Sequence, residues 1–137
     1  LGFTDGEGNP SIRKVFSTWH KGLGTHLIST NVSSMHVQAL LKDDRACLYF
    51  NDSAAGVCFT GKAVVHCDHE HKALMWEDGC ERYYPEGVDD PDYCVVEFIA
   101  DSGRYYRFDG KGDISAQELA SYDKDARMKD YAAKTAM

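Results

Sequence analysis

Residues 47–65 read CLYFNDSAAGVCFTGKAVV, and this segment is the strongest indication of the fold class. It holds two runs of β-branched, aromatic and small apolar residues, Cys47 to Phe50 and Val57 to Val65, which are the residue types that strands favour. The residues between the two runs, 51–56, are small or polar and typical of a turn. The pattern predicts a long β-hairpin, so we expect a sheet at the centre of the fold.

The chain that follows this hairpin is predicted to form one helix and two further strands. Asp68 can cap a helix over residues 69–76, which ends before a long loop that contains prolines and glycines. Residues 95–100 and 104–108 have the composition of strands, and the glycine-containing link 101–103 between them is typical of a hairpin. The sheet is therefore expected to gain two strands here.

The chain before the central hairpin is predicted to supply a first hairpin, a third strand and a helix. The strand-like residues 1–4 and 11–18 flank a run of turn formers at 5–10. Residues 26–30 have the composition of another strand. In residues 33–41, two serines precede helix formers with apolar residues at i, i+3 and i+4 spacing, which predicts a short capped helix.

These elements together predict a mostly-β (α+β) protein built on an antiparallel, barrel-like sheet of six or seven strands with two short internal helices. Residues 113–137 contain neither Pro nor Gly and are rich in helix formers, so they predict a polar C-terminal helix. The length of 137 residues suits one domain, 1–137, with a single core.

The composition argues against several classes of protein. The chain has 22 acidic and 15 basic residues and a net charge of −7. Because this charge repels the phosphate backbone of nucleic acids, we do not expect nucleic acid as a partner. Its apolar runs are far shorter than the roughly 20 residues that span a bilayer, so we expect no membrane association. The five cysteines are an odd number without a CxxC pair, which fits reduced, mostly buried thiols in the cytoplasm.

Two segments imitate metal-binding motifs. Residues 66–71 read HCDHEH, but alternation at the end of a strand should send these side chains to opposite faces, so we expect no metal site there. Residues 109–118 imitate half of an EF-hand loop. Arg107 and Lys111 stand at the first and fifth ligand positions, where Ca²⁺ requires oxygen atoms, so we exclude calcium.

Several short motifs follow one another at fixed spacing. They are Gly8-Asn9-Pro10-Ser11-Ile12-Arg13, Ser29-Thr30-Asn31-x-Ser33-Ser34, Val37-Gln38-Ala39-Leu40, Ala46-Cys47-Leu48-Tyr49-Phe50, Gly61-Lys62-Ala63, Trp76 and Tyr84-Pro85-x-Gly87-x-Asp89-Asp90-Pro91-Asp92-Tyr93. In order and spacing they resemble the pyridoxamine 5′-phosphate oxidase-like family, and the last three resemble its general-stress-protein branch. The resemblance covers roughly residues 3–108 and includes six motifs of several residues, together with Trp76, in register, which chance does not readily produce.

The resemblance implies a split β-barrel that forms a homodimer and holds two FMN molecules at the subunit interface, each contacted by both subunits. It implies no particular catalytic residue. The cofactor-binding residues that it implies are Arg13, Lys14, Val15, Thr30, Asn31, Ser34, His36 and Trp76.

These residues suit the cofactor chemically. A phosphate dianion needs a cationic fork, hydroxyl donors and free N–H groups at the start of a helix. Arg13, on the predicted second strand, supplies the fork, and residues 30–34 supply the hydroxyl and amide groups at the turn from strand to helix. The resemblance also implies that the flavin ring lies against the backbone of residues 13–15, with its edge covered by an aromatic side chain of the partner subunit such as Trp76. From the residues alone, Arg13 can also be an exposed strand cation, Ser34 a helix cap, and Trp76 a core side chain.

The sequence departs from the family at one place. The family usually has a lysine or arginine pair after the second serine, where this chain has Met35 and His36. A nearby phosphate favours protonated imidazole, so His36 can substitute for a fixed cation at a cost of about 1–3 kcal/mol. A solvated helix position is the alternative role for His36.

The resulting hypothesis is an FMN-dependent oxidoreductase that acts on a small molecule. No acid–base catalyst stands out, which suits chemistry carried by a flavin. Oxidation of vitamin B6 itself is disfavoured, because the chain lacks an evident C-terminal substrate-binding extension. The alternatives are a non-catalytic flavin-binding or stress-related dimeric scaffold, or a split barrel that binds a different cofactor such as haem or a deazaflavin.

Overall fold

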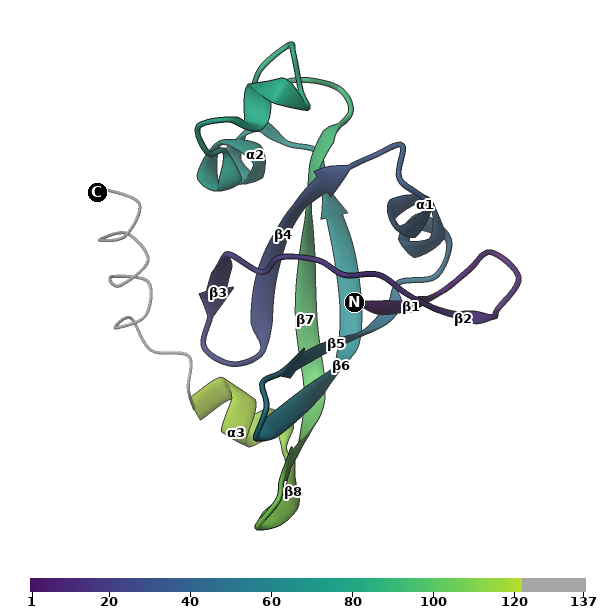
Figure 1. The fold of residues 1–137 in the computed structure, drawn as a ribbon. Coiled ribbons are helices and arrows are strands. Elements are labelled where there is room, and N and C mark those ends of the chain that lie inside the picture. The colour runs from purple at the N-terminus through teal and green to yellow at the C-terminus, as the bar shows by residue number, and fades with distance from the viewer. Residues whose placement is uncertain (122–137) are drawn as a thin grey trace.

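A computed structural model of the chain describes residues 1–121, which form eight strands and three α-helices (Figure 1). The strands are β1 Gly2–Thr4, β2 Pro10–Ile12, β3 Trp19–Lys21, β4 Thr25–Asn31, β5 Arg45–Asn51, β6 Ala55–His66, β7 Tyr93–Arg107 and β8 Gly110–Ile114. The helices are α1 Met35–Lys42, α2 His69–Met75 and α3 Ala116–Ser121, and a 3₁₀ turn covers Cys80–Arg82. None of the helices in this described part is long and apolar enough to cross a membrane.

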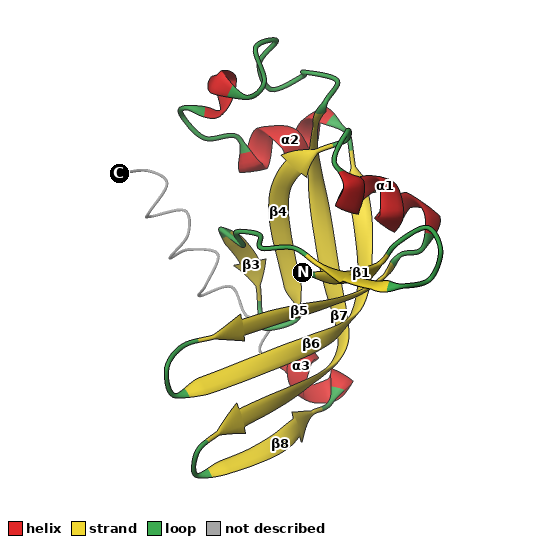
Figure 2. Cartoon of the chain, turned by 45° about the vertical axis from the view of Figure 1, so that its right-hand side comes forward, coloured by secondary structure: helices red, strands yellow, loops and turns green. Residues whose placement is uncertain are grey.

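The strands form one antiparallel sheet in the order β2-β1-β5-β6-β7-β4-β3, with β8 beside the end of β7. The first half of β7 pairs with β4 and its second half with β8, while β6 pairs with β7 along its whole length. The two long strands bend and pass from the part of the sheet that contains β4 into the part that contains β5 and β8 (Figure 2). The prediction of a mostly-β, antiparallel split barrel is confirmed, with eight strands among residues 1–121 instead of six or seven.

The predicted hairpin at residues 101–103 is wrong, because β7 is one continuous strand of 15 residues. The pairing with β6 shifts register between Thr60 and Gly61, so that Thr60 faces Ser102, Gly61 faces Ala100, and Asp101 has no partner residue. The extra residue is thus absorbed as a β-bulge, which bends the strand without ending it. The 12-residue β6 offers ladder partners on both sides of this point, which is why a turn-like sequence stays extended.

The predicted C-terminal helix begins later than expected. Residues 110–114 form β8, which pairs with the end of β7 through a two-residue turn, Arg107 facing Gly110. The EF-hand-like sequence is therefore part of a hairpin. The helix itself starts with α3 at Ala116, and the rest of the predicted helix, 122–137, lies outside the described residues.

The second predicted strand also ends early. β2 stops at Ile12, and residues 13–18 form no regular element, so the prediction that Arg13 and its neighbours lie within a strand is wrong. Arg13 nevertheless exchanges two backbone hydrogen bonds with Leu1, of 2.8 and 2.9 Å. Beyond it the chain runs free of the ladder to β3, a strand that the sequence did not predict. The segment 14–18 therefore keeps its backbone polar groups available.

Both internal helices start at the predicted caps. Ser34 caps α1, its hydroxyl accepting a hydrogen bond from the backbone N–H of Val37. Asp68 caps α2, its carboxylate accepting from the backbone N–H of His71 at 3.0 Å, and this hydrogen bond, with that to the His71 ring, holds the pKa of Asp68 at about 2. These caps satisfy N–H groups that a helix start leaves unpaired.

Two apolar clusters lie on opposite faces of the sheet. Side chains alternate along β7, so Cys94, Val96 and Phe98 face the barrel interior, whereas Tyr93 and Val95 face outward. The interior cluster is closed by α1 through Val37 and Leu40. The outer cluster holds Trp19, Leu27, Met75, Tyr93 and Val95, with Trp76 and Tyr84 packed against it.

We predict that Gly61→Ala destabilises the protein by about 2–3 kcal/mol, the usual scale of overpacking. A Cβ atom at Gly61 would overlap the backbone carbonyl of Ile99 and lie 2.8 Å from Cα of Ala100, at the bulge that both long strands share. The midpoint of urea unfolding at fixed protein concentration measures the effect. Gly110→Ala is the matched control, because a Cβ there meets no atom within 4 Å. Equal midpoints for both variants would contradict the close packing at the bulge.

Candidate functional site

A cleft of about 460 Å³ opens where four segments meet: residues 13–18, β4, the start of α1, and the end of α2 with the loop after it. This volume lies in the range of small-molecule sites. The cleft is lined by Arg13, Lys14, Val15, Phe16, Thr18, Ile28, Ser29, Thr30, Asn31, His36, Met75, Glu77, Cys80 and Tyr84. It therefore combines cations and hydroxyl groups with an apolar wall.

The turn from β4 to α1 is rigidly held. The Ser34 hydroxyl donates to the carbonyl of Asn31 at 2.7 Å, so it closes the turn as well as capping the helix. From outside, Asp92 accepts hydrogen bonds from the backbone N–H and the hydroxyl of Ser33, at 2.8 and 3.0 Å, and the backbone N–H of Val32 donates to the Asp92 carbonyl at 2.7 Å. The start of α1 thus presents its N–H groups in a fixed position.

His36 is buried at the base of the cleft, with 1% of its surface exposed, so the alternative of a solvated helix position is wrong. Its Nε2 lies 2.8 Å from the Thr30 hydroxyl. Its Nδ1 is buried and has no hydrogen-bond partner among the described residues. Burial, and then the charge of Arg13, lower the pKa of His36 below its ordinary value of 6.5. The imidazole is therefore neutral at neutral pH in the free protein.

The mouth of the cleft is cationic. Arg13 and Lys14 are both exposed, and Arg13 forms no ion pair with any carboxylate of residues 1–121. Lys14 places its ammonium group 5.6 Å from the centre of the Phe16 ring. Glu77 is the acidic residue of the lining. Two neighbouring cations against one carboxylate make this cleft a local exception in a chain of net charge −7.

The loop after α2 is fixed against the sheet by a buried lysine. Lys72, 4% exposed, donates from Nζ to the carbonyl of Asp90 at 2.9 Å. The Asp90 carboxylate accepts from the backbone N–H groups of Glu86 and Asp92, at 3.1 and 2.9 Å. This network holds Tyr84 at the cleft and Asp92 at the turn. The loop predicted from the motif thus supports the site and does not contribute ligands through its aspartates.

Six of the eight residues predicted to bind a cofactor line this cleft: Arg13, Lys14, Val15, Thr30, Asn31 and His36. Ser34 stands directly behind it as the helix cap. Trp76 is not part of the lining; it packs edge-on against Tyr93, with ring centres 5.3 Å apart, and lies 6.4 Å from the Tyr84 ring. A contribution of Trp76 to the site of the partner subunit stays a prediction.

The other lining residues were missed: Phe16, Thr18, Ile28, Ser29, Met75, Glu77, Cys80 and Tyr84. Ser29 belongs to the motif that identified Thr30 and Asn31, so its presence was within reach of the sequence. The approach of Met75 and Glu77 depends on how α2 packs across the outer face of β4, which no local pattern encodes.

A larger, open hollow of about 580 Å³ lies between the β5–β6 turn and the end of β7. Its charged lining residues are Asp52 and Arg107, and tyrosines 105 and 106 form much of its wall. No helix begins there among the described residues. It therefore offers less to an anionic ligand than the cleft beside α1, which we take as the candidate site.

Comparison with known families finds a match over most of the chain. Residues 22–124 match the family described as pyridoxamine 5′-phosphate oxidase like. No curated protein sequence matches the chain. The matched residues include every strand from β4 to β8.

Solved structures show the same fold. A Clostridium acetobutylicum protein related to general stress protein 26 of B. subtilis, of the pyridoxinephosphate oxidase family, is 38% identical, with 86% of this chain and 84% of that chain covered and a TM-score of 0.75. A heme binding protein from Mycobacterium smegmatis is 17% identical (88% and 53% covered, TM-score 0.66). A pyridoxamine 5′-phosphate oxidase-related, FMN binding protein from Nostoc punctiforme is 12% identical (82% and 75%, TM-score 0.61). The last two show similarity of fold alone.

We predict that the free energy of unfolding falls as the pH drops from 7.5 to 5.5. Burial lowers the pKa of both His36 and His26, so below about pH 6.5 the unfolded chain binds protons that the folded chain does not. The loss is at most about 1.4 kcal/mol per pH unit for each histidine. Urea unfolding across this range measures it, and His36→Gln should flatten the profile. A variant profile as steep as that of the unmodified protein would show that His36 is not held neutral.

Proposed function

The chain belongs to the pyridoxamine 5′-phosphate oxidase-like family, and from this premise we propose that it binds FMN in the cleft beside α1 and acts as an FMN-dependent oxidoreductase on a small molecule. The observation that carries the proposal is the meeting of Arg13, Lys14 and the Thr30 hydroxyl with the capped start of α1 in one cleft. These are the groups that a phosphate ester needs.

The phosphate of FMN would lie at the cationic end of the cleft. Arg13 has no competing carboxylate among the described residues, so its guanidinium is available for two parallel hydrogen bonds to phosphate oxygens. The start of α1 borders the same cleft through Asn31 and His36, and a helix start leaves its first N–H groups without internal partners. The unpaired, buried Nδ1 of His36 is a further polar atom that a ligand could satisfy. The residues present therefore fit an anionic ligand, although His36 enters as a neutral imidazole.

The flavin ring would lie along residues 13–15. The segment 14–18 has no ladder partner, so its backbone N–H and carbonyl groups are free for the polar edge of the ring. Val15, Met75 and Tyr84 offer the apolar wall that the ring faces need. When bound, the flavin supplies the hydride-transfer chemistry, and the chain binds and orients it.

We place the second half of the site on a partner subunit of a homodimer. Large apolar side chains are exposed next to the cleft, Phe16 at 72% and Ile12 at 82%, and exposed apolar groups of this kind are typical of interfaces. A second copy would cover them and bring its Trp76 to the ring edge.

The described structure holds five free cysteines, which agrees with a reducing, cytoplasmic location.

Titration with FMN tests the proposal. We predict that Arg13→Ala weakens binding about 10- to 100-fold, because one charge-assisted hydrogen-bonding group is worth about 1.5–3 kcal/mol. Binding is measured by the change in flavin absorbance at about 450 nm and by the quenching of flavin fluorescence. The matched control is Arg45→Ala, which removes an exposed guanidinium paired with Asp43 outside the cleft. Equal affinities for the two variants, or no FMN binding at all, would contradict the proposed site. A haem absorbance spectrum of the purified protein would favour haem as the cofactor.

Turnover separates an enzyme from a flavin-binding protein. We predict that a nicotinamide donor reduces the bound FMN without oxygen and that an added electron acceptor restores the oxidised spectrum. Stopped-flow absorbance measures both steps. A bound flavin that neither reaction changes would indicate a flavin-binding stress protein without its own activity.

A further inference from the structure

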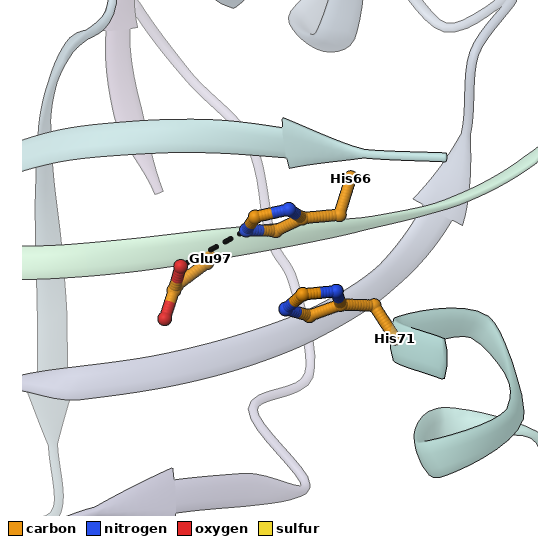
Figure 3. Close-up of side chains that lie close together, drawn as sticks. All are labelled: His66, His71 and Glu97. Carbon is orange, nitrogen blue, oxygen red and sulfur yellow. Dashed lines mark hydrogen bonds and ion pairs between the residues drawn. The ribbon is translucent and has the colours of Figure 1, made fainter. Parts of the chain in front are cut away.

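Three potential metal ligands meet on the outer face of the sheet, outside the cleft lining. His66 ends β6, His71 lies in the first turns of α2, and Glu97 projects from β7 (Figure 3). One ligand atom of each lies within 4.8 Å of the others. Alternation at the end of the strand predicts that the two histidines diverge. That expectation was wrong, because the chain turns from strand into helix at Asp68 and folds His71 back over His66.

The strand register and the start of α2 fix the positions of the three side chains. Val64 faces Glu97 and His66 faces Val95 across the β6–β7 ladder, so His66 and Glu97 are diagonal neighbours on one face. Nε2 of His66 lies 2.9 Å from Oε1 of Glu97. The His66 and His71 rings are stacked, with centres 3.7 Å apart and planes 4° from parallel (Figure 3). One nitrogen of each ring lies on the side of the Glu97 carboxylate (Figure 3).

Asp68 orients His71. Its two oxygen atoms lie 2.9 and 2.8 Å from Nδ1 of His71, while the same carboxylate accepts from the His71 backbone N–H as the helix cap. An Nδ1–H donated to a carboxylate leaves Nε2 unprotonated, which is the arrangement of histidines that bind metals. The helix cap thus also fixes the tautomer and the direction of a ligand.

The cluster is reachable and chemically selective. The side chains of His66, Glu97 and His71 are 21, 26 and 31% exposed, so an ion can enter while the sheet and helix still hold the ligands. Zn²⁺ binds nitrogen and oxygen ligands at about 2.0–2.2 Å. The three donor atoms lie within 4.8 Å of one another, so they have to move closer together around an ion, and the two stacked rings have to tilt until both nitrogens point at it. Two imidazoles and one carboxylate suit divalent transition metals better than Mg²⁺ or Ca²⁺, which prefer oxygen ligands alone.

We propose that His66, His71 and Glu97 bind one divalent transition-metal ion of the Zn²⁺ class, with Asp68 positioning His71 and water in the open coordination position. The ion replaces the His66–Glu97 hydrogen bond and ties α2 to β6 and β7. Because Met75 at the other end of α2 lines the cleft, the ion also secures one wall of the candidate site. The proposal does not depend on FMN, since none of the three ligands lines the cleft.

Calorimetric titration of the flavin-free full chain with Zn²⁺, under reducing conditions, tests this site. We predict one ion per chain, and a loss of affinity on the order of tenfold or more in His66→Ala, His71→Ala and Glu97→Gln. Zn²⁺ should also raise the melting temperature of the unmodified protein, because it binds the folded chain, and the three variants should lose that rise. His69→Ala is the matched control: this neighbouring histidine is exposed and paired with Asp89, outside the cluster.

Other outcomes would overturn the proposal. An equal loss in His69→Ala would mean surface binding, and a loss in Cys67→Ser would mean that the exposed thiolate of Cys67 holds the ion. The Co²⁺ spectrum of the unmodified protein requires no variant: visible bands of a low-symmetry site with nitrogen and oxygen ligands are expected, and the spectrum of hydrated Co²⁺ alone would contradict the site. Glu97→Gln keeps the side-chain volume, so its affinity remains informative if a histidine variant folds poorly.

Discussion

The antiparallel pairing of β6 with β7 is the constraint on which the rest of the molecule depends. It runs along all 12 residues of β6 and carries the strands through the bend between the two parts of the sheet. At the bend, Gly61 lets the backbone of β7 approach closely while Asp101 leaves the ladder as a bulge. A side chain at Gly61 would push the strands apart where both halves of the barrel share them.

This pairing also places the candidate site. The first half of β7 is flanked by β4 on one side and β6 on the other, so the chain leaving β4 and the chain entering β7 meet at one end of the sheet. Asp92, just before β7, can therefore hold Ser33, just before α1. The rigid start of α1 follows from that meeting, whereas Arg13 is held by its backbone hydrogen bonds to Leu1. The same end of β6 carries His66 into contact with α2.

Local signals in the sequence were sufficient for much of this. The central hairpin, both helix caps and six cleft residues followed from composition, capping chemistry and the family resemblance. The three strand errors, at residues 101–103, 110–114 and 13–18, have one cause, which is that ladder partners outweigh local preference. Residues 101–103 stay extended because β6 pairs on both sides of them, and residues 110–114 form a strand because β7 is there to receive them. Residues 13–18 lack such a partner and lose the predicted strand.

The histidine cluster was missed for a related reason. Alternation along a strand describes only side chains that remain on that strand. β6 ends at His66, and two residues later Asp68 caps the start of α2. Likewise, His36 lies on α1, and its burial depends on Phe3 of β1 and Thr30 of β4. Both features arise from tertiary packing, whereas helix caps and turns arise from residues adjacent in the chain.

A crystal structure of the protein crystallised with FMN is the sharpest test of FMN binding in the cleft beside α1. The account predicts the phosphate within hydrogen-bond distance of the Arg13 guanidinium and the start of α1, and the flavin ring along residues 13–15 at an interface between two copies. Electron density for FMN in the hollow beside Tyr105 and Tyr106, or a cleft beside α1 that stays empty at saturating FMN, would contradict it.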